Sequence, residues 1–399
     1  MNSENEPHTE VGGVPLPTRL LDGYQVHRAA LARDLNTLAL PRQVLLAGTV
    51  SAVPSELSYT HGVPEASGLS AVTFAQDHRL KRALLDRAKL PTPTGASFSW
   101  KSISEAEKWA EKIGYPVILR EGVGENPVRA IGNITSGEQL RAAFNELRRR
   151  DKADRTPGSN PHTAGYATTR LTFTFDEEGN EVAPLRSRML VEKQMPGRTV
   201  RAFVIGDELV AAVELDTDDS TGVRSVKHEL SAEDVALFTQ TAAAVPGLAC
   251  ATVDAVQNPE SPQQGSFPLL ITGISERPRI ETYASADAGL GDVIGDALLN
   301  FQAGEAQVDL PAAVSTIFRR IEVEGLRHAD QVAKELPSIA ESYGARISVE
   351  HSDAVSGDVV GTASGTPEVL AALVELLMAG CLVDDRAAAV NYSKGSSVA

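Results

Sequence analysis

The sequence contains few of the residues that support extracellular or membrane roles. Its 399 residues include only two cysteines, Cys250 and Cys381, and no CxxC pair, so it cannot build a disulfide framework. No stretch approaches the roughly 18 uncharged apolar residues that a membrane span needs. Residues 1–13 are polar and lack the basic and apolar regions of a secretory signal. We therefore expect a cytoplasmic protein that does not bind membranes.

Basic and aromatic side chains are also scarce. The 37 Lys and Arg are outnumbered by 53 Asp and Glu, which gives a net charge of -16. Nucleic-acid binders need clustered Lys and Arg against phosphates, and single-strand binders stack bases on aromatic rings, which make up 5% of this chain. We therefore expect no nucleic-acid partner. The 42% of hydrophobic residues suffices for the cores of two or three domains of about 150 residues each.

Local patterns divide the chain into four segments. Residues 1–17 are mostly polar, contain three prolines and predict a disordered tail. Residues 18–73 predict a short α/β region. Residues 74–304 alternate helices, strands and hairpins, and residues 312–394 predict the βαββαβ order of ferredoxin-like domains. We expect this C-terminal domain to have its own core.

Five motifs of the central segment follow one another in a fixed order. They are residues 77–93 (DHRLKRALL, then LPTP), residues 113–120 (IGYPVILR), residues 190–207 (LVEKQMPG, then VRAFVIGD), residues 245–254 (VPGL, then VD) and residues 274–278 (ISERP). In this order and spacing they resemble the ATP-grasp superfamily, in particular the amide-bond ligases typified by cyanophycin synthetase, glutathione synthetase and D-alanine–D-alanine ligase. The resemblance covers somewhat more than half of the chain.

The resemblance implies an α+β protein with a specific architecture. Two α+β subdomains of the ATP-grasp fold would enclose ATP, with a truncated α/β region before them and the ferredoxin-like domain after them. Ligases of this family activate a carboxylate as an acyl phosphate, which an amine then attacks. Such phosphoryl transfer depends on positioning and charge neutralisation, with Mg²⁺ held by oxygen ligands. An active enzyme would use ATP and Mg²⁺, whereas an inactive protein of this fold would need no cofactor.

The nucleotide site of the family can be carried over residue by residue. His78 and Arg120 stand where the family has its two phosphate-binding lysines. Glu192, Lys193 and Met195 match the hinge that binds adenine, although the first two could also be solvated hairpin residues. Arginine keeps the positive charge of lysine but differs in shape, so its presence at position 120 is not a conservative replacement.

The metal and transfer site departs further from the family pattern. Asp254 matches the first acidic metal ligand, but the family's glutamate and asparagine fall at Gly273 and Ser275. Glu276 is the acidic substitute nearest in sequence, although strand alternation places it opposite Ser275 unless a bulge intervenes, and a surface ion pair is the alternative. Arg201, like Arg120, is a candidate catalytic residue because an arginine of the family near this position can contact phosphates, although Arg201 could equally be a strand-edge residue that faces solvent.

The predicted lid, residues 121–126 (EGVGEN), carries two glutamates where a phosphate would lie. Two hypotheses follow. The protein is a carboxylate–amine ligase with an altered site, or it is a catalytically inactive ATP-grasp scaffold with a structural, assembly or partner-binding role. Loss of one transition-state donor typically costs about 2.7–4 kcal/mol of activation free energy, so several replacements favour the second hypothesis. Its partners would be a nucleotide, a second copy of the chain, or a protein that binds the C-terminal domain.

Overall fold

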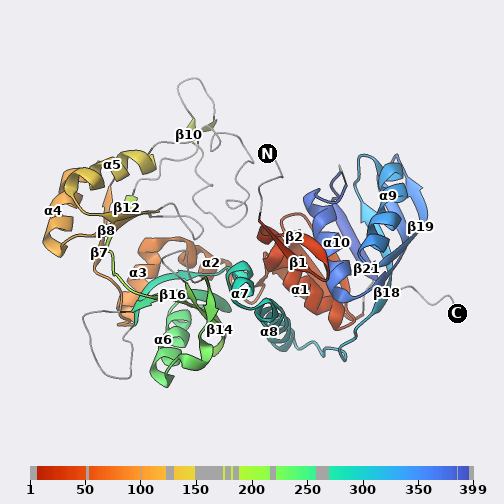
Figure 1. Cartoon of the computed structure of the whole chain (residues 1–399), viewed down its shortest axis with the longest axis horizontal. Helices are drawn as coiled ribbons and strands as arrows, with labels where there is room; N and C mark the ends of the chain where they lie inside the picture. Colours follow the sequence, from red (N-terminus) through yellow and green to blue (C-terminus); the bar gives the residue numbers. More distant parts are fainter. Residues whose placement is uncertain are drawn as a thin grey trace. The chain divides into compact units, whose positions relative to one another are not determined.

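The computed structural model divides the chain into two compact units (Figure 1). Unit 1 comprises Met1–Ala66 and Arg277–Ala399, and unit 2 comprises Ser67–Glu276. The residues that the structure describes are 7–50, 54–99, 101–122, 130–148, 174–175, 181–182, 188–215, 222–257, 269–383 and 385–394. Helices and antiparallel strand pairs occur in both units. The α+β class predicted from the sequence is therefore confirmed.

Unit 1 is built on one eight-stranded sheet. The strands, in the order in which they pair, are β19 (Arg346–Asp353), β20 (Asp358–Gly365), β18 (Ile317–Glu324), β21 (Ala389–Ser393), β3 (Asn36–Leu40), β4 (Val44–Gly48), β5 (Leu57–Thr60) and β6 (Val63–Pro64). The β21–β3 pair joins the C-terminal strands to the N-terminal ones, with Tyr392 opposite Thr37. The sequence assigns residues 18–73 and 312–394 to different domains, whereas here their strands share one sheet. This pairing hydrogen-bonds edges that would otherwise be exposed.

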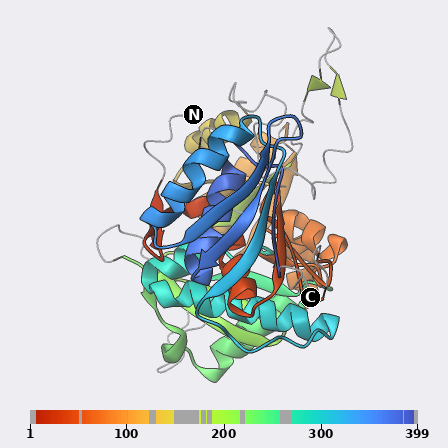
Figure 2. The same cartoon turned by 90° about the vertical axis from the view of Figure 1, so that its right-hand side faces the viewer.

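Helices of unit 1 pack against this sheet and against one another (Figure 2). They are α1 (Leu21–Ala32), α7 (Ile280–Ala286), α8 (Ala288–Ala306), α9 (Ala329–Ser342) and α10 (Pro367–Ala379). In α10, the Thr366 side chain accepts a hydrogen bond from the Val369 N–H, and Gly380 ends the helix in the left-handed conformation. Helix α1 lies between α8 and α10 and is buried along almost its whole length. The core of unit 1 therefore combines segments from both ends of the chain.

The N-terminal segment is ordered from residue 7 onward. Strands β1 (His8–Val11) and β2 (Val14–Pro17) form an antiparallel hairpin, followed by the short 3-10 helix η2 (Thr18–Leu20). The prediction of a disordered tail is therefore wrong for these residues, and residues 1–6 lie outside the described part of the chain. The physical reason is burial, because Val14 and Leu16 are fully enclosed in the core.

Two antiparallel sheets with covering helices form unit 2. The first sheet has the order β7 (Gly95–Ser99), β12 (Arg188–Lys193), β8 (Val117–Glu121) and β9 (Ala130–Ile134), and it packs with α4 (Ile103–Ile113) and α5 (Gly137–Arg148). Its core includes Leu119, Phe144 and Val191. A separate short pair joins β10 (Thr174–Phe175) to β11 (Glu181–Val182). The helices supply the apolar stripe that this small sheet needs to form a core.

The second sheet of unit 2 has five strands. Their order is β15 (Arg224–Ser225), β14 (Glu208–Leu215), β13 (Thr199–Ile205), β16 (Cys250–Gln257) and β17 (Leu269–Ser275). The accompanying helices are α2 (Leu69–Gln76), α3 (His78–Arg87), the 3-10 helix η6 (Lys227–Glu229) and α6 (Ala232–Ala243). Helix α6 begins with a reciprocal capping box between Ser231 and Asp234. Unit 2 therefore contains two antiparallel sheets of four and five strands, each with its own helices.

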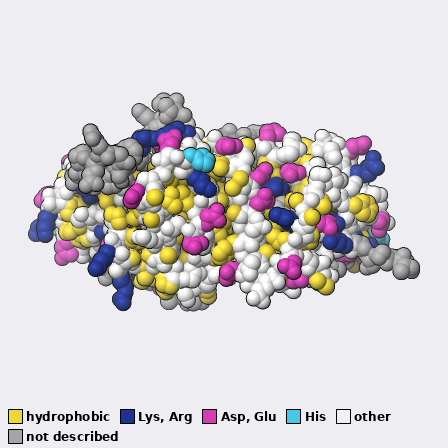
Figure 3. Space-filling model, turned by 90° about the horizontal axis from the view of Figure 1, so that it is seen from below, with side chains coloured by type: hydrophobic (Ala, Val, Ile, Leu, Met, Phe, Trp, Pro, Cys, Tyr) yellow, Lys and Arg dark blue, Asp and Glu magenta, His cyan; other side chains and the backbone are white. Residues whose placement is uncertain are grey.

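Acidic and basic side chains are interspersed over the face shown in Figure 3. In the part of the chain that the structure describes, every helix is too short or too polar to cross a membrane.

Candidate functional site

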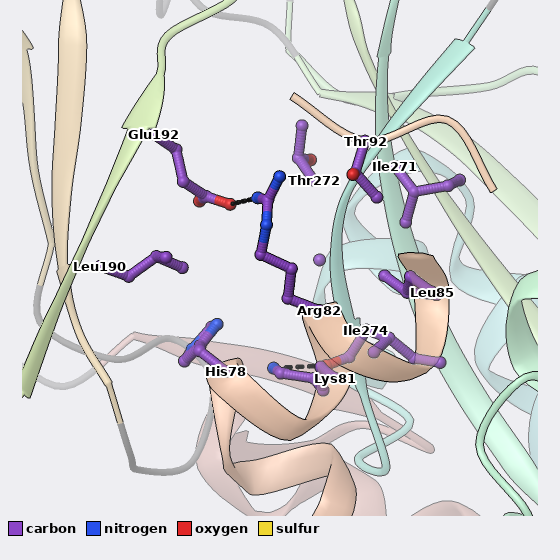
Figure 4. A pocket seen from close by; sticks show the side chains of 11 residues that line it. His78, Lys81, Arg82, Leu85, Thr92, Leu190, Glu192, Ile271, Thr272 and Ile274 are labelled. Carbon is purple, nitrogen blue, oxygen red and sulfur yellow. Dashed lines mark hydrogen bonds and ion pairs between the residues drawn. The ribbon is translucent and has the colours of Figure 1, made fainter. Parts of the chain in front are cut away.

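Helix α3 supplies the basic side chains of the candidate site. Asp77 caps the helix, because its carboxylate accepts hydrogen bonds from the backbone N–H groups of Arg79 and Leu80. The spacing of His78, Lys81 and Arg82 then places all three on one face of the helix. Figure 4 shows these side chains directed into a cavity of unit 2.

The cavity combines apolar walls with a small group of charged side chains. It is lined by His78, Lys81, Arg82, Leu85, Thr92, Leu190, Glu192, Ile271, Thr272, Gly273 and Ile274. These residues come from α3, from the segment after it, and from strands β12 and β17, which belong to different sheets of unit 2. An apolar site with a few convergent polar groups is the usual form of a small-molecule site.

Among the described residues that line this cavity, Glu192 is the only one with a carboxylate, and two arginines lie beside it. Its Oε1 atom accepts a hydrogen bond from Arg82 Nη1 at 3.0 Å, and its Oε2 atom lies 3.3 Å from Arg120 Nε. Burial raises the pKa of the Glu192 carboxyl above its ordinary value, although Arg120, Arg82 and Lys81 act in the opposite direction. A ligand that used this carboxylate would therefore compete with arginine.

His78 is enclosed beside positive charge. Its side chain is 6% exposed, and its Nε2 atom makes no hydrogen bond among the described residues. Burial lowers the pKa of the imidazole well below its ordinary value, and the nearby Lys81 and Arg120 lower it further. The imidazole is therefore neutral at pH 7. Lys81 itself donates to the Ile274 carbonyl oxygen at 2.9 Å.

The structure brings three of the predicted nucleotide-site residues together and leaves two apart. His78 and Glu192 line the cavity, and Arg120 reaches it through its ion pair with Glu192. Lys193 points to the other side of its strand, because its Nζ atom donates to the carbonyl oxygens of Gly114 and Tyr115 at 3.0 and 2.7 Å. Met195 is half-buried beyond the strand and does not line the cavity. Residues 123–126 of the predicted lid lie outside the described residues.

The predicted metal ligand Asp254 is bound to an arginine. Arg201 Nε and Nη2 donate to its two carboxylate oxygens at 2.7 and 3.1 Å, which is a bidentate pair between neighbouring strands β13 and β16. Both side chains are 16% exposed. The two predicted residues thus contact each other. Arg201 is therefore not a strand-edge residue that faces solvent, because β13 pairs with a strand on each side. A cation at Asp254 would have to displace this guanidinium.

The second predicted metal ligand is separated from the first. Asp254 pairs with Gly273 and Thr252 pairs with Ser275, so Glu276 lies about three residues, or about 10 Å, farther along the sheet. Glu276 is 2% exposed, which rules out a surface position, and it accepts a hydrogen bond from Gln76 Nε2 at 2.9 Å. No cluster of three or more His, Cys, Asp or Glu able to hold a metal occurs among the described residues. These residues therefore do not fit the Mg²⁺ of a ligase.

Comparison with known proteins gives matches only among solved structures. No family model matches the sequence, and no curated protein matches it. Similar structures include the ATP-grasp ligase PsnB with a phosphomimetic variant of its minimal precursor, Mg and ADP, at 13% identity, 59% coverage of this chain, 61% of that chain and a TM-score of 0.40. The chain thus spans about three fifths of the length of PsnB.

Two further similar structures are ligases or synthetases. D-alanine–D-alanine ligase from Bacillus anthracis shares 12% identity, with 60% of this chain and 71% of that chain covered and a TM-score of 0.39. The ADP complex of purK, N5-carboxyaminoimidazole ribonucleotide synthetase, shares 14% identity, with 79% and 73% covered and a TM-score of 0.41. The chain resembles ATP-grasp ligases.

Sequence reasoning missed two residues of this ATP-grasp-like site. Lys81 and Arg82 follow His78 at helical spacings of three and four residues, which places them on the same face of a helix. This periodicity could have identified them. Their partners, the Ile274 carbonyl and the Glu192 carboxylate, come from two different sheets and carry no local signal in the sequence.

Proposed function

We propose that the protein is a catalytically inactive ATP-grasp-like scaffold that binds a phosphate-bearing ligand, such as a nucleotide, without Mg²⁺-dependent ligation. The observation that carries the proposal is the bidentate pair between Arg201 and Asp254. The guanidinium neutralises the one carboxylate that matches a family metal ligand. Together with the distance to Glu276, this pairing argues against a magnesium centre formed by the described residues.

The charge around the cavity supports an anionic ligand. Three cationic side chains, Lys81, Arg82 and Arg120, lie at the cavity, together with one carboxyl group, that of Glu192. Partial burial strengthens the field of this excess, because water screens it less. The neutral imidazole of His78 can donate a hydrogen bond to a phosphate oxygen without adding to the repulsion among the cations. A phosphate group could thus be bound without a metal counter-ion.

A ligase with an altered site is the second candidate. The supporting observation is the convergence of His78, Arg120 and Glu192, which come from three elements far apart in the sequence, at one cavity. Each of them occupies a position of the ligase motifs. This function would require Mg²⁺ to be held by other groups, since the described acidic residues form no cluster for it.

Thermal unfolding with ATP, with ATP and Mg²⁺, with Mg²⁺ alone and with inorganic phosphate tests the proposal. Ligand at about 100 times its Kd adds about 2.7 kcal/mol to the free energy of unfolding. We expect ATP to raise the Tm equally with and without Mg²⁺, and ADP release to stay at background. Arg120→Gln should raise the apparent Kd for ATP, as derived from the Tm shift, at least tenfold. Arg87→Gln, which changes an exposed residue of α3, should leave this Kd unchanged.

Two results would contradict this proposal. No Tm shift at millimolar ATP, with or without Mg²⁺, would exclude nucleotide binding. Release of ADP that requires Mg²⁺ and increases when a carboxylic acid and an amine are supplied together would instead establish the ligase candidate.

A further inference from the structure

The side chain of Arg82 lines the cavity of unit 2 and reaches from α3 to Glu192 (Figure 4). Its Nη1 atom donates to Glu192 Oε1 on β12 at 3.0 Å. Its Nη2 atom donates to the Pro93 carbonyl oxygen at 2.7 Å. With 19% of its side chain exposed, Arg82 is held mostly inside the protein.

A glycine leaves space for this guanidinium. Gly95 is the strand partner of Glu192, and a Cβ atom at Gly95 would lie 2.5 Å from Arg82 Nη1 and 2.8 Å from Glu192 Cγ. Gly95 is not among the residues with positive φ, so its backbone conformation does not require glycine. The glycine instead leaves the volume that the side chains of Arg82 and Glu192 fill. The residue type at position 95 therefore agrees with a contact between Arg82 and Glu192 in the folded protein.

The rest of the Glu192 environment does not depend on Arg82. Arg120 Nε lies 3.3 Å from the other carboxylate oxygen, Oε2, and forms an ion pair with it. Leu190 and Ile271 supply apolar lining on opposite sides of the cavity. Without Arg82, the Oε1 atom of this buried carboxylate would face the cavity and would lack the hydrogen bond that Arg82 donates. Such an oxygen selects a planar group with N–H donors, as in guanidines, amidines and amino-substituted rings.

We infer that Arg82 is a built-in occupant of the Glu192 end of the cavity and determines which ligands can enter. Its guanidinium takes the place of a planar N–H donor from a ligand, and such a ligand binds only after Arg82 has left. The inference deepens the proposed function, since it concerns the same cavity, and it assigns to Arg82 a role in specificity that is separate from phosphate binding by the other cations.

The test uses the full chain with Arg82→Ala and the matched variant Arg87→Ala, which lies on the exposed face of the same helix. Methylguanidinium, which reproduces the missing group, is titrated by calorimetry and by Tm. We expect Arg82→Ala to bind it at least tenfold more tightly than the wild type or Arg87→Ala. Addition of Glu192→Gln to Arg82→Ala should remove this gain. Equal affinity for methylguanidinium in all variants would overturn the inference.

A second variant covers the case in which Arg82→Ala does not fold. Arg82→Lys keeps a positive charge near Glu192, but an ammonium group lacks the planar fork that contacts both Glu192 and Pro93. We expect it to bind methylguanidinium more tightly than the wild type does. Unchanged affinity in a folded Arg82→Lys protein would count against the inference.

Binding of ATP and adenosine separates this inference from the proposed function. If methylguanidinium binds Arg82→Ala and ATP binds neither protein, the role of Arg82 is supported and the nucleotide function fails. If ATP binds the wild type and methylguanidinium binds neither protein, the function is supported and the role of Arg82 fails. Tighter binding of adenosine to Arg82→Ala supports the inference, because adenosine has an amino-substituted ring and no phosphate.

Discussion

At the scale of single residues, arginine–carboxylate pairs define both candidate sites. Glu192 lies between Arg82 and Arg120, and Asp254 is held by Arg201. In each case the acidic side chain that could receive a ligand or metal already has a cationic partner. Truncation of one partner leaves a partly buried charge uncompensated, which makes these pairs costly to open. Residue chemistry therefore favours binding without metal-dependent turnover.

The protonation of His78 gives a prediction at the same scale. The pKa of His78 is lower in the folded protein, so the unfolded chain binds this proton more readily. Protonation therefore favours unfolding. The stability of the folded state falls as the pH drops below the unfolded pKa of about 6.5. Between pH 7.5 and pH 5.5 this loss is on the order of 1 kcal/mol. Denaturant unfolding at both pH values should show a smaller loss for His78→Gln.

His351→Gln is the control for this measurement, since His351 is exposed on β19. It should leave the pH dependence of the wild type unchanged. A His78→Gln protein that loses as much stability as the wild type between the two pH values would show that His78 does not contribute to the acid sensitivity.

At the scale of elements, unit 1 depends on close approach between two helices. A Cβ atom at Gly295 of α8 would lie 2.5 Å from the backbone oxygen of Gln25 in α1. Backbone cannot give way as a flexible side chain does, so the two helices would have to separate.

In unit 2, strand alternation decides which side chains reach the cavity. Along β12 it directs Leu190 and Glu192 into the cavity and Lys193 away from it.

Two alanine substitutions in α8 test this packing. Gly295→Ala should lower the free energy of unfolding by about 1–3 kcal/mol, the usual cost of overpacking. Gly304→Ala in the same helix meets no atom within 4 Å and should stabilise by up to about 1 kcal/mol through its helix propensity. Chemical denaturation measures both values. Equal effects of the two substitutions would contradict close packing at Gly295.

At the scale of the whole molecule, the two ends of the chain form one unit. Strand β21 pairs with β18 on one side and with β3 on the other, and its Val390 and Tyr392 are each 1% exposed. The C-terminal segment therefore completes a sheet that the N-terminal segment begins. Because the long-range pair closes the fold, unit 1 should lose cooperativity if either end is removed.

Deletion of residues 389–399 should test this closure. Loss of β21 exposes the edges of β3 and β18 and removes two large buried side chains, so we expect no cooperative unfolding transition for unit 1 by calorimetry. The control is deletion of residues 395–399, which removes none of the described contacts and should leave the Tm unchanged. A cooperative transition that survives loss of 389–399 would show that the two ends are energetically independent.

Local sequence patterns predict the α+β class and most helices and strands, because periodicity and capping act over a few residues. The motifs that resemble the ATP-grasp superfamily are likewise visible in the sequence alone. The sequence also predicted His78, Arg120 and Glu192 as site residues, and the structure places these three at one cavity. Only the tertiary structure decided which groups meet. The pairs Arg82–Glu192 and Arg201–Asp254 span 110 and 53 residues, and the β21–β3 pair joins opposite ends of the chain. Strand register and side-chain direction set these contacts, and both depend on long-range packing that no local pattern encodes.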